Sequence, residues 1–326
     1  MASNAPSVVS LGNLTIDDTV LPNGRIHMAV PGGGALYSVV ATRIWTDSVG
    51  IVTRVGHGYP DRVRHQFEQA AISLDGWCMA TQEPLRTWVL YEDAGTRRYF
   101  SRHLEASQIQ LVDGNSFDRY LQIVCQHQED LSPQPADIPR LFHSANVFHL
   151  APIVPVCQIE LLHHLSKKTD GAVLLDPHYD LMTTCDESVF DDLLANTNFF
   201  LPSEEDLCAR YGDFKRDTLK RLAERGPKVA GVKLGERGCL LYDKEEDKFY
   251  RVPIYPTTAI DVTGAGDAFC AGFAAALSQG DNIADAAACA TASASFAIQE
   301  FGGLHLLRIN RLDALKRKAW VLERIV

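Results

Sequence analysis

The sequence lacks the cysteine and glycine spacings that mark several common classes of protein. Its eight cysteines are scattered without a CxxC pair, so the spacing of a zinc site is missing, and a chain of 326 residues does not need disulfide bridges. No GxxxxGK[ST] phosphate loop is present, which excludes a Walker-type nucleoside triphosphatase. A dinucleotide-binding GxGxxG is also missing, because Phe269 stands where the third glycine after Gly264-Ala265-Gly266 would fall. We therefore expect reduced thiols and neither of these nucleotide-binding loops.

Long apolar runs and an excess of positive charge are absent as well. No apolar stretch approaches the length needed to cross a bilayer, and residues 1–6 lack the basic and apolar regions of a signal peptide. With 31 basic against 41 acidic residues, the net charge of −10 argues against nucleic acid or an anionic membrane as the main partner. These absences predict a cytoplasmic protein, and they leave room for a local basic cleft that binds a phosphorylated ligand.

What the sequence does contain is an alternation of two hydrophobic patterns. Short apolar runs, several of them unbroken, are typical of strands buried on both faces; they occur at residues 8–11, 49–55, 147–150, 172–175, 199–201, 229–234 and 239–242. Between them, apolar residues recur with helical spacing at residues 34–45, 63–72, 117–127, 158–165, 214–224, 268–277 and 284–298. This alternation predicts an α/β fold with a mainly parallel central sheet flanked by helices.

Two segments break the alternation and predict β-hairpins. Residues 19–30 carry Asn23-Gly24 between apolar residues, which is a strong hairpin signal. Residues 86–100 are extended on both sides of Asp93-Ala94-Gly95, which predicts a second hairpin with a longer turn. We expect the two hairpins, at about 17–31 and 84–102, to form a small separate sheet over one edge of the main domain. The alternative is that they are edge strands of the main sheet.

The nine residues that begin at Asp261 are the most informative in the chain. The small residues Gly264, Ala265 and Gly266 allow a sharp turn and lead into an apolar helix, so consecutive N–H groups are exposed at the helix N-terminus. Free donors and the helix dipole at that end suit an anion. Asp267 would lie beside this anion, where electrostatics alone would not place an acid. We interpret it as a base that deprotonates a nucleophile as it attacks a phosphate.

A second glycine cluster, Gly32-Gly33-Gly34, follows the first predicted hairpin and precedes a helix. Glycines there let a substrate approach the backbone, so that its hydroxyls bond to amide groups; the alternative is a plain flexible turn. Asp17 is a candidate acceptor for a substrate hydroxyl, and its alternative role is that of a cap or turn residue. Asp176, at the end of another predicted strand, is a weaker candidate for a residue that faces the cleft.

In these residues the chain resembles the ribokinase-like (PfkB) carbohydrate kinase family over nearly its whole length. The resemblance is carried by Gly12 and Asp17, by Gly32-Gly33, by the segment KLGERG from Lys233 to Gly238, and by the segment from Asp261 to Asp267. It implies one kinase domain over residues 1–326, with a central sheet flanked by helices and a small β-lid made from the two hairpins. It also implies that, with Mg²⁺, the γ-phosphoryl group of ATP is transferred to a hydroxyl of a sugar, polyol or related molecule.

The resemblance further implies four sets of site residues. The base and the anion hole would be Asp267 with the amides of Gly264, Ala265 and Gly266. Substrate hydroxyls would be held by Asp17, Gly32 and Gly33. The nucleotide would lie along Lys233, Gly235 and Gly238. A monovalent cation, K⁺, would lie near Asp261 and Thr263 in some members.

Three places depart from the family pattern. Tyr37 stands where most members carry an asparagine that touches the sugar, and its ring would shrink the pocket and offer the substrate a stacking face. The family's Asn-x-x-Glu, which organises Mg²⁺ and phosphate beside the nucleotide, falls on Ser203 and Asp206, so the amide is lost and the carboxylate is one methylene shorter. Where many members have Gly-x-Asp, this chain has GHG at residues 56–58. The identity of the substrate does not carry over through these changes.

Three functions remain open at this point. A sugar or polyol kinase is favoured because Asp267 and the glycines of the anion hole are intact. A nucleoside kinase is the alternative that a stacking Tyr37 would support. A binding protein that keeps the fold without catalysis is the third, suggested by the changes at Tyr37 and Ser203. A homodimer through the lid would use the apolar lid residues Val20, Ile26, Met28, Trp88 and Val89.

Overall fold

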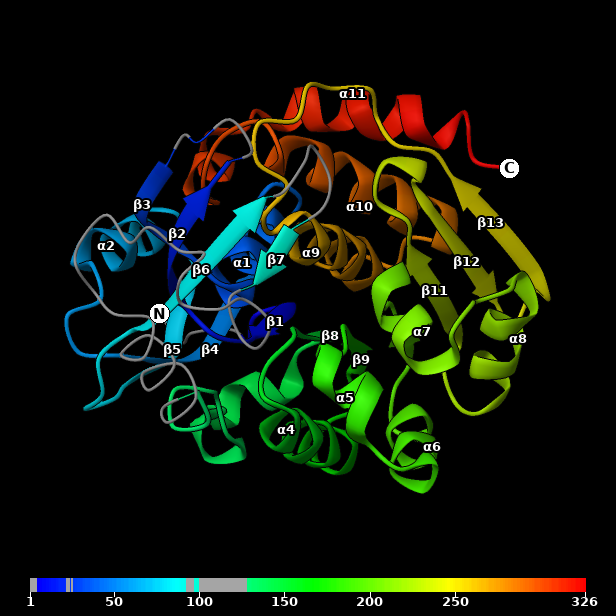
Figure 1. Ribbon diagram of the computed structural model, residues 1–326, viewed down its shortest axis with the longest axis horizontal. Coiled ribbons are helices and arrows are strands. Elements are labelled where there is room, and N and C mark those ends of the chain that lie inside the picture. The colour runs from blue at the N-terminus through cyan, green and yellow to red at the C-terminus, as the bar shows by residue number, and fades with distance from the viewer. Residues whose placement is uncertain (1–4, 22–23, 25, 92–96, 100–127) are drawn as a thin grey trace.

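The main body of the protein is a nine-stranded sheet with helices on both faces. The computed structural model describes residues 5–21, 24, 26–91, 97–99 and 128–326 (Figure 1). The strand order is β13-β12-β11-β10-β9-β8-β1-β4-β5. The strands are β1 (Val8–Leu11), β4 (Val49–Val55), β5 (Ser73–Met79), β8 (Val147–Leu150), β9 (Ala172–Leu175), β10 (Phe199–Phe200), β11 (Val229–Lys233), β12 (Cys239–Asp243) and β13 (Lys248–Val252). All neighbours from β11 to β5 run parallel, while β12 and β13 are antiparallel.

Two hydrophobic cores hold helices against the two faces of this sheet. On one face, Leu36, Phe67 and Phe273 belong to a core formed with α1, α2, α9 and α10; on the other, Leu161 and Phe190 belong to a core formed with α4 to α8. Figure 1 shows α4 to α8 below the sheet and α9 to α11 above it. The helices are α1 (Gly34–Arg43), α2 (Asp61–Gln69), α4 (Pro155–Lys168), α5 (Tyr179–Thr184), α6 (Glu187–Ala195), α7 (Glu204–Tyr211), α8 (Arg216–Glu224), α9 (Ala265–Ser278), α10 (Ile283–Ala297) and α11 (Arg311–Leu322).

A second, four-stranded sheet forms the lid. Its order is β3-β2-β6-β7, with β2 (Thr15–Val20), β3 (Ile26–Gly32), β6 (Leu85–Tyr91) and β7 (Arg97–Tyr99). The pairs β2–β3 and β6–β7 are antiparallel, and β2 and β6 run parallel between them. Both predicted hairpins are therefore confirmed, and they form a separate sheet rather than edge strands of the larger one. The residues of the second predicted turn, 92–96, lie outside the described residues.

The lid strand β3 is fastened to the main body by close contacts. The ring of His27 stacks on that of Phe301, with 3.5 Å between their centroids. The loop that carries Phe301 also meets β3 at Gly302, where an added Cβ would lie 2.6 Å from Val30 Cγ1. Contact at two points keeps the lid strand in a fixed place beside the start of α1.

The apolar residues that the sequence suggested for a lid dimer differ in exposure. Ile26 is 38% exposed, whereas Val20 and Met28 are half-buried. Val89 is 1% exposed, so it packs within the protomer and the expectation that it offers a contact face is wrong. The side chain of Trp88 lies outside the described part of the chain.

The predicted elements agree with the fold with a few exceptions. All seven predicted strands are present, as are six of the seven predicted helices; the helix predicted at 117–127 falls outside the described residues. Strands β5 and β13 were not predicted, and both show mixed burial instead of an unbroken apolar run. Among the described residues, no helix combines the length and the apolar character needed to cross a membrane.

Candidate active site

The candidate site lies where several parallel strands end and two helices begin. Strands β1, β8, β9 and β11 all end at the same edge of the sheet, because they run parallel. Gly12, Asp176 and Lys233 stand at or directly after three of these ends. Helices α1 and α9 pack on each other, and their first residues, Gly34 and Ala265, belong to the same site through the contacts below. This edge is where ligands bind in open α/β sheets.

The N-terminus of α9 is shaped by Gly264. This residue caps the helix with φ +74°, a left-handed conformation that side chains with a Cβ rarely adopt. The N–H of Ala268 donates to the Gly264 carbonyl at 2.9 Å, so the helix is regular from its first turn. Asp267 is the third residue of α9, and Gly266 precedes it. The N–H groups of this first turn have no partner within the helix, and together with the dipole they would suit the anion expected here from the sequence.

Tyr37 lies directly beneath this turn. An added Cβ on Gly264 would overlap the Tyr37 ring, and a Cβ on Gly303 would lie 3.0 Å from Tyr37 Cδ1. The ring is thus held between two glycines, and Tyr37 is 2% exposed. The stacking face that the sequence suggested for a substrate is covered by the protein's own backbone. In this structure Tyr37 supports the turn of the anion site.

The three consecutive glycines each make room for a different neighbour. A Cβ on Gly32 would overlap the Asp17 carboxylate, and a Cβ on Gly33, whose φ is +95°, would overlap the Asn13 carbonyl. A Cβ on Gly34 would lie 2.8 Å from Oδ1 of Asp267. The glycine cluster therefore contacts both Asp267, the predicted base, and Asp17, the residue predicted to accept a hydrogen bond from a substrate hydroxyl. The contact of Gly34 with Asp267 was not predicted, since a glycine run alone does not say what packs against it.

Asp17 is a buried carboxyl group in an acidic setting. It is 6% exposed, and its Oδ1 accepts a hydrogen bond from Thr15 Oγ1 at 2.6 Å. Burial raises the pKa of Asp17 to about 7, the bond from Thr15 opposes this, and the charges of Asp261, Asp18 and Asp267 add to the rise. A group with this pKa takes or gives a proton near neutrality, as polar ligand-binding groups often do.

The neighbouring Asp18 has a structural role instead. Its side chain is fully buried, forms an ion pair with Arg86 of β6, and accepts the Ala29 N–H at 2.8 Å. Ala29 has φ +55°, at the irregular pairing between β2 and β3. Asp18 therefore joins three strands of the lid, while Asp17, one residue earlier, faces the site.

The KLGERG segment forms a tight turn between β11 and β12. The Leu234 N–H donates to the Gly238 carbonyl at 2.8 Å, and a short 3₁₀ helix, η4 (Gly235–Arg237), lies between them. Lys233, the last residue of β11, points back to the anion site, because a Cβ on Gly266 would lie 3.4 Å from Lys233 Nζ. The predicted nucleotide segment and the predicted anion hole are thus neighbours.

Ser203 and Asp206 form a capping box at the start of α7. Asp206 Oδ2 accepts the Ser203 N–H at 2.7 Å and the Ser203 hydroxyl at 2.6 Å, and the Asp206 N–H donates back to Ser203 Oγ at 3.3 Å. The backbone of Ser203 also forms an isolated parallel β-bridge with that of Lys233, so α7 begins beside the KLGERG turn. Helix capping explains both residue types, and it holds the Asp206 carboxylate in one orientation.

Asp261 and Thr263 lie in the segment that leads into α9. The Thr263 N–H donates to Asp261 Oδ1 at 2.9 Å, and both residues are buried. The Ile260 N–H donates to the Ile298 carbonyl at 2.7 Å, which ties this segment to the end of α10. The segment is therefore fixed on both sides of Asp261.

Three buried residues near the anion site were given no role by sequence reasoning or only a weak one. His149 of β8, Asp176 after β9 and Cys270 of α9 lie together, and the ammonium group of Lys233 pairs with the Asp176 carboxylate. Positions 149, 176 and 270 share no motif, and a signal was available only for Asp176, which ends a predicted strand.

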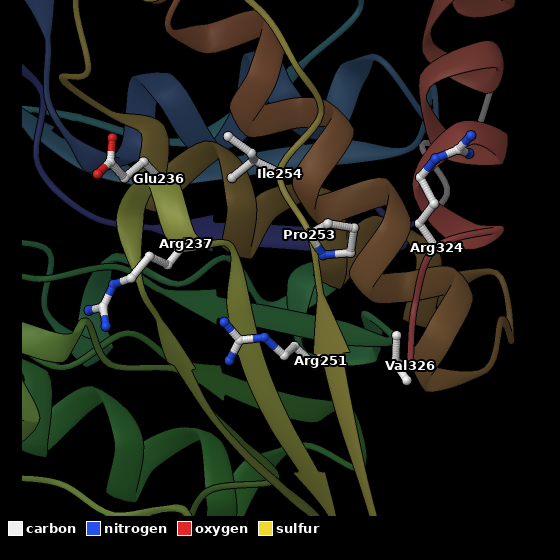
Figure 2. A pocket seen from close by; sticks show the side chains of 7 residues that line it. All are labelled: Glu236, Arg237, Arg251, Pro253, Ile254, Arg324 and Val326. Carbon is white, nitrogen blue, oxygen red and sulfur yellow. The ribbon is translucent and has the colours of Figure 1, made fainter.

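A pocket lies beyond the KLGERG turn, away from Asp267. It has a volume of about 280 Å³. Figure 2 shows its lining residues, which come from the turn after β11, from β13 and the residues that follow it, and from the C-terminal segment: Glu236, Arg237, Arg251, Pro253, Ile254, Arg324 and Val326. Arg237 pairs with Glu204 and Arg324 with Glu323, so two of its three guanidinium groups already have acidic partners. This pocket is separate from the predicted catalytic residues.

Comparison with known proteins identifies the family. The family model for pfkB family carbohydrate kinase matches residues 109–309. A cytidine kinase from Thermococcus kodakarensis is 26% identical over 285 residues, which are 84% of this chain and 89% of that protein.

Solved structures agree with the fold. A nucleoside kinase from Methanocaldococcus jannaschii, described as an archaeal member of the ribokinase family, has a TM-score of 0.72 and 18% identity, covering 98% of this chain and all of that one. Ribokinase from Arabidopsis thaliana, solved with ribose and ATP, has a TM-score of 0.66 and 20% identity, covering 96% and 99% of the two chains. The ribokinase-like fold predicted from the sequence is confirmed.

Proposed function

Because the chain belongs to the pfkB family of carbohydrate kinases, phosphotransferases that act on hydroxyl groups, we propose that it transfers the γ-phosphoryl group of ATP to a hydroxyl of a sugar, polyol or related small molecule. One observation carries this proposal. Asp267 stands in the first turn of α9, beside the anion site, and meets the same glycine segment as the buried Asp17. An acid and an acceptor for hydroxyls thus border one anion site.

Asp267 is the proposed base. Its Oδ1 lies against Gly34, so an acceptor hydroxyl placed between Asp17 and the start of α9 would be within its reach. The carboxylate would take the hydroxyl proton as the oxygen attacks phosphorus. The N–H groups at Gly264, Ala265 and Gly266 would stabilise the charge on the transferring phosphoryl group, which matters most because the transition state is loose.

The acceptor is held by the lid side of the site. Asp17 would accept a substrate hydroxyl, and the backbone at Gly32 and Gly33, which lies against the Asp17 carboxylate and the Asn13 carbonyl, would bond to others. The lid sheet would limit the entry of water and so limit wasteful hydrolysis.

The nucleotide would lie along Lys233, Gly235 and Gly238. Mg²⁺ supplies charge neutralisation on ATP phosphates, and it is bound in proteins through one or two carboxylates and water. Asp206 fits this need: its cap bonds both use Oδ2, and Ser203 fixes its orientation. Asp261 and Thr263 are the residues we propose beside a monovalent cation such as K⁺.

A nucleoside acceptor is the second candidate. The cytidine kinase from Thermococcus kodakarensis matches 84% of this chain, which favours a nucleoside. Tyr37 does not add to this argument, because its ring is buried under Gly264. The choice between the two acceptor classes therefore depends on the lid side of the site.

The proposal is tested by measuring ADP release with a panel of sugars, polyols and nucleosides. We expect turnover with at least one class, and we expect Asp267→Asn to reduce it by about 10²- to 10⁴-fold while ATP binding, followed by thermal shift, is kept. Near-normal turnover in this variant would refute the role of Asp267. If the wild type releases no ADP with any compound of the panel and ATP causes no thermal shift, a binding protein without catalysis would be favoured.

A further inference from the structure

Four side chains from four different elements meet beneath the start of α9. Lys233 comes from β11, Asp176 follows β9, His149 comes from β8, and Cys270 is in the second turn of α9. The Lys233 ammonium pairs with Asp176 Oδ2 and lies 3.8 Å from Cys270 Sγ. Cys270 Sγ in turn lies 3.5 Å from Asp176 Oδ2. The four groups form one buried polar cluster.

The cluster contains one ion pair and two neutral groups. The side chains of Lys233 and Asp176 are only 14% and 5% exposed. Burial opposes the charge on Lys233, but the Asp176 carboxylate outweighs it and raises the pKa of the ammonium group. Burial, and then the charge of Lys233, lowers the pKa of His149 to about 3, so its ring is neutral. Burial raises the pKa of Cys270, which stays a thiol.

The ammonium group lies at the anion site itself. A Cβ on Gly266 would be 3.4 Å from Lys233 Nζ, so at this glycine no side chain separates the ammonium group from the first turn of α9. Cys270 is three residues after Asp267, on the same side of the helix by helical spacing. The positive charge thus stands against Gly266, the residue before the proposed base, in the first turn of α9.

A metal ion would compete with this lysine for the same ligands. Ligand atoms of His149, Asp176 and Cys270 lie within 4.8 Å of one another. Among the described residues, His149 Nε2 has no hydrogen-bond partner, while Nδ1 contacts Ser38 Oγ at 2.8 Å. The ammonium of Lys233, however, already engages Asp176, and the thiol of Cys270 is not ionised. The cluster is therefore built around an ammonium group.

We propose that Asp176 is a positioning residue that holds the ammonium of Lys233 at the start of α9, where it contacts the outermost phosphate of bound ATP. His149 and Cys270 are the uncharged neighbours of this ion pair. The inference rests on the proposed function, since it takes ATP as the ligand of the anion site. A purely structural ion pair between β9 and β11 is the alternative.

Nucleotide binding separates these two explanations without any need for turnover. We would measure the affinities of ATP, ADP and AMP by calorimetry for the wild type, Lys233→Met, Asp176→Asn and the double variant. Loss of a charged contact to phosphate predicts about 10- to 100-fold weaker ATP binding in Lys233→Met, with little change for AMP. The double variant removes both charges, so it leaves no buried unpaired charge and should fold even if a single variant does not.

The pH profile of binding tests the role of Asp176. The titratable groups around Lys233 are Asp176, Asp206, His149 and Cys270, and Asp267 acts on Cys270 from the first turn of α9. Without Asp176, burial lowers the pKa of the ammonium, so ATP affinity of Asp176→Asn should fall further between pH 7.5 and pH 9. The wild type should stay flat over this range, because its ion pair keeps the ammonium charged.

A matched control is available in another buried lysine pair. Lys318 of α11 pairs with Asp285 of α10 at 2.8 Å, and its side chain is 18% exposed. Asp285→Asn should leave ATP affinity unchanged at every pH.

ATP affinity restored to the wild-type value in the double variant, or unchanged in Lys233→Met, would show that the pair is structural and overturn the inference. If the wild type binds ATP but phosphorylates no acceptor, the proposed function fails while this test still gives an answer.

Discussion

The two sides of the candidate site are built in different ways. The floor, made by the start of α9 with Tyr37 and the lysine cluster, relies on close packing: Gly264 lies on the Tyr37 ring, and Gly34 lies against Asp267. The lid side relies on charge, because Asp17 and Asp18 are adjacent buried carboxyl groups with different partners. In our proposal, packing places the phosphate on the floor, whereas the lid side holds the acceptor through Asp17, a carboxyl group that titrates near neutrality.

This difference explains why one side was easier to read from the sequence. A turn that needs small residues leaves a short motif of glycines, and the segment from Asp261 to Asp267 is such a motif. Recognition of an acceptor by a few polar groups leaves no comparable motif, since any acid at the end of a strand looks the same in sequence.

The largest effect that would test the comparison is expected at Gly264. Gly264→Ala should reduce turnover by about 10²-fold, because the added methyl would overlap the Tyr37 ring and displace the anion site. Gly280→Ala is the matched control: its φ is +81°, and a Cβ there meets nothing within 4 Å. Both variants should lose about 1–2 kcal/mol of stability from backbone strain. Gly264→Ala should lose about 1–3 kcal/mol more from the overlap with Tyr37, and only this variant should lose activity. Steady-state kinetics beside urea unfolding measures both quantities, and equal activity in the two variants would contradict the floor as described.

The next effect concerns Asp17 on the lid side. Its folded-state pKa of about 7 lies above the unfolded value, so the folded protein binds this proton more tightly, and stability from this group is lost as pH rises from about 4 to 7. Asp17→Asn has no such titration and should be more stable than the wild type at pH 8, by about 1–3 kcal/mol. The same variant should raise the KM for the acceptor about 10-fold at pH 8, where the wild-type carboxylate accepts the substrate hydroxyl.

Thermal unfolding and acceptor KM from pH 5 to pH 8 measure both effects. Asp18→Asn serves as the control, because it breaks the buried pair with Arg86 and should lower stability at every pH. If the stability of Asp17→Asn changes with pH in the same way as that of the wild type, then titration of Asp17 does not cause the loss of stability between about pH 4 and pH 7.

The smallest effect is expected at Ser203. Ser203→Ala removes the hydroxyl from the capping box of α7 and should cost about 1 kcal/mol of stability. Asp206 keeps its bond from the Ser203 N–H, so ATP affinity should change by less than about threefold. Chemical unfolding and calorimetry give the two values. A loss of ATP affinity greater than tenfold would mean that Ser203 contacts the nucleotide itself.

Much of the fold followed from the sequence because local patterns and global structure agree. Unbroken apolar runs gave the parallel strands, and Asn23-Gly24 marked the first lid hairpin. Strand β13 was missed because an edge strand alternates in burial and contains Lys248 and Arg251. The burial of the Tyr37 ring could not be predicted either, because it depends on contacts with two residues far away in the sequence, Gly264 and Gly303.

The lysine cluster shows a second limit. His149, Asp176 and Cys270 come from three elements that only the strand order brings together, so no spacing in the chain connects them. Each looks ordinary by itself: a histidine within a strand, an acid after a strand and a cysteine within a helix. Their common role depends on Lys233, whose contact with Asp176 exists only in the folded protein.

The separation of the lid sheet from the nine-stranded sheet has an evolutionary consequence. In the part of the chain that the structure describes, the two sheets share no strand, and short links, such as residues 12–14 between β1 and β2, join them. We therefore expect substitutions in the lid strands away from Gly32 to change which alcohol is accepted with little effect on the phosphate end. A protein built in this way can diversify its substrates by exchanging hairpins, and grafting lid strands between relatives offers a direct route to new acceptors.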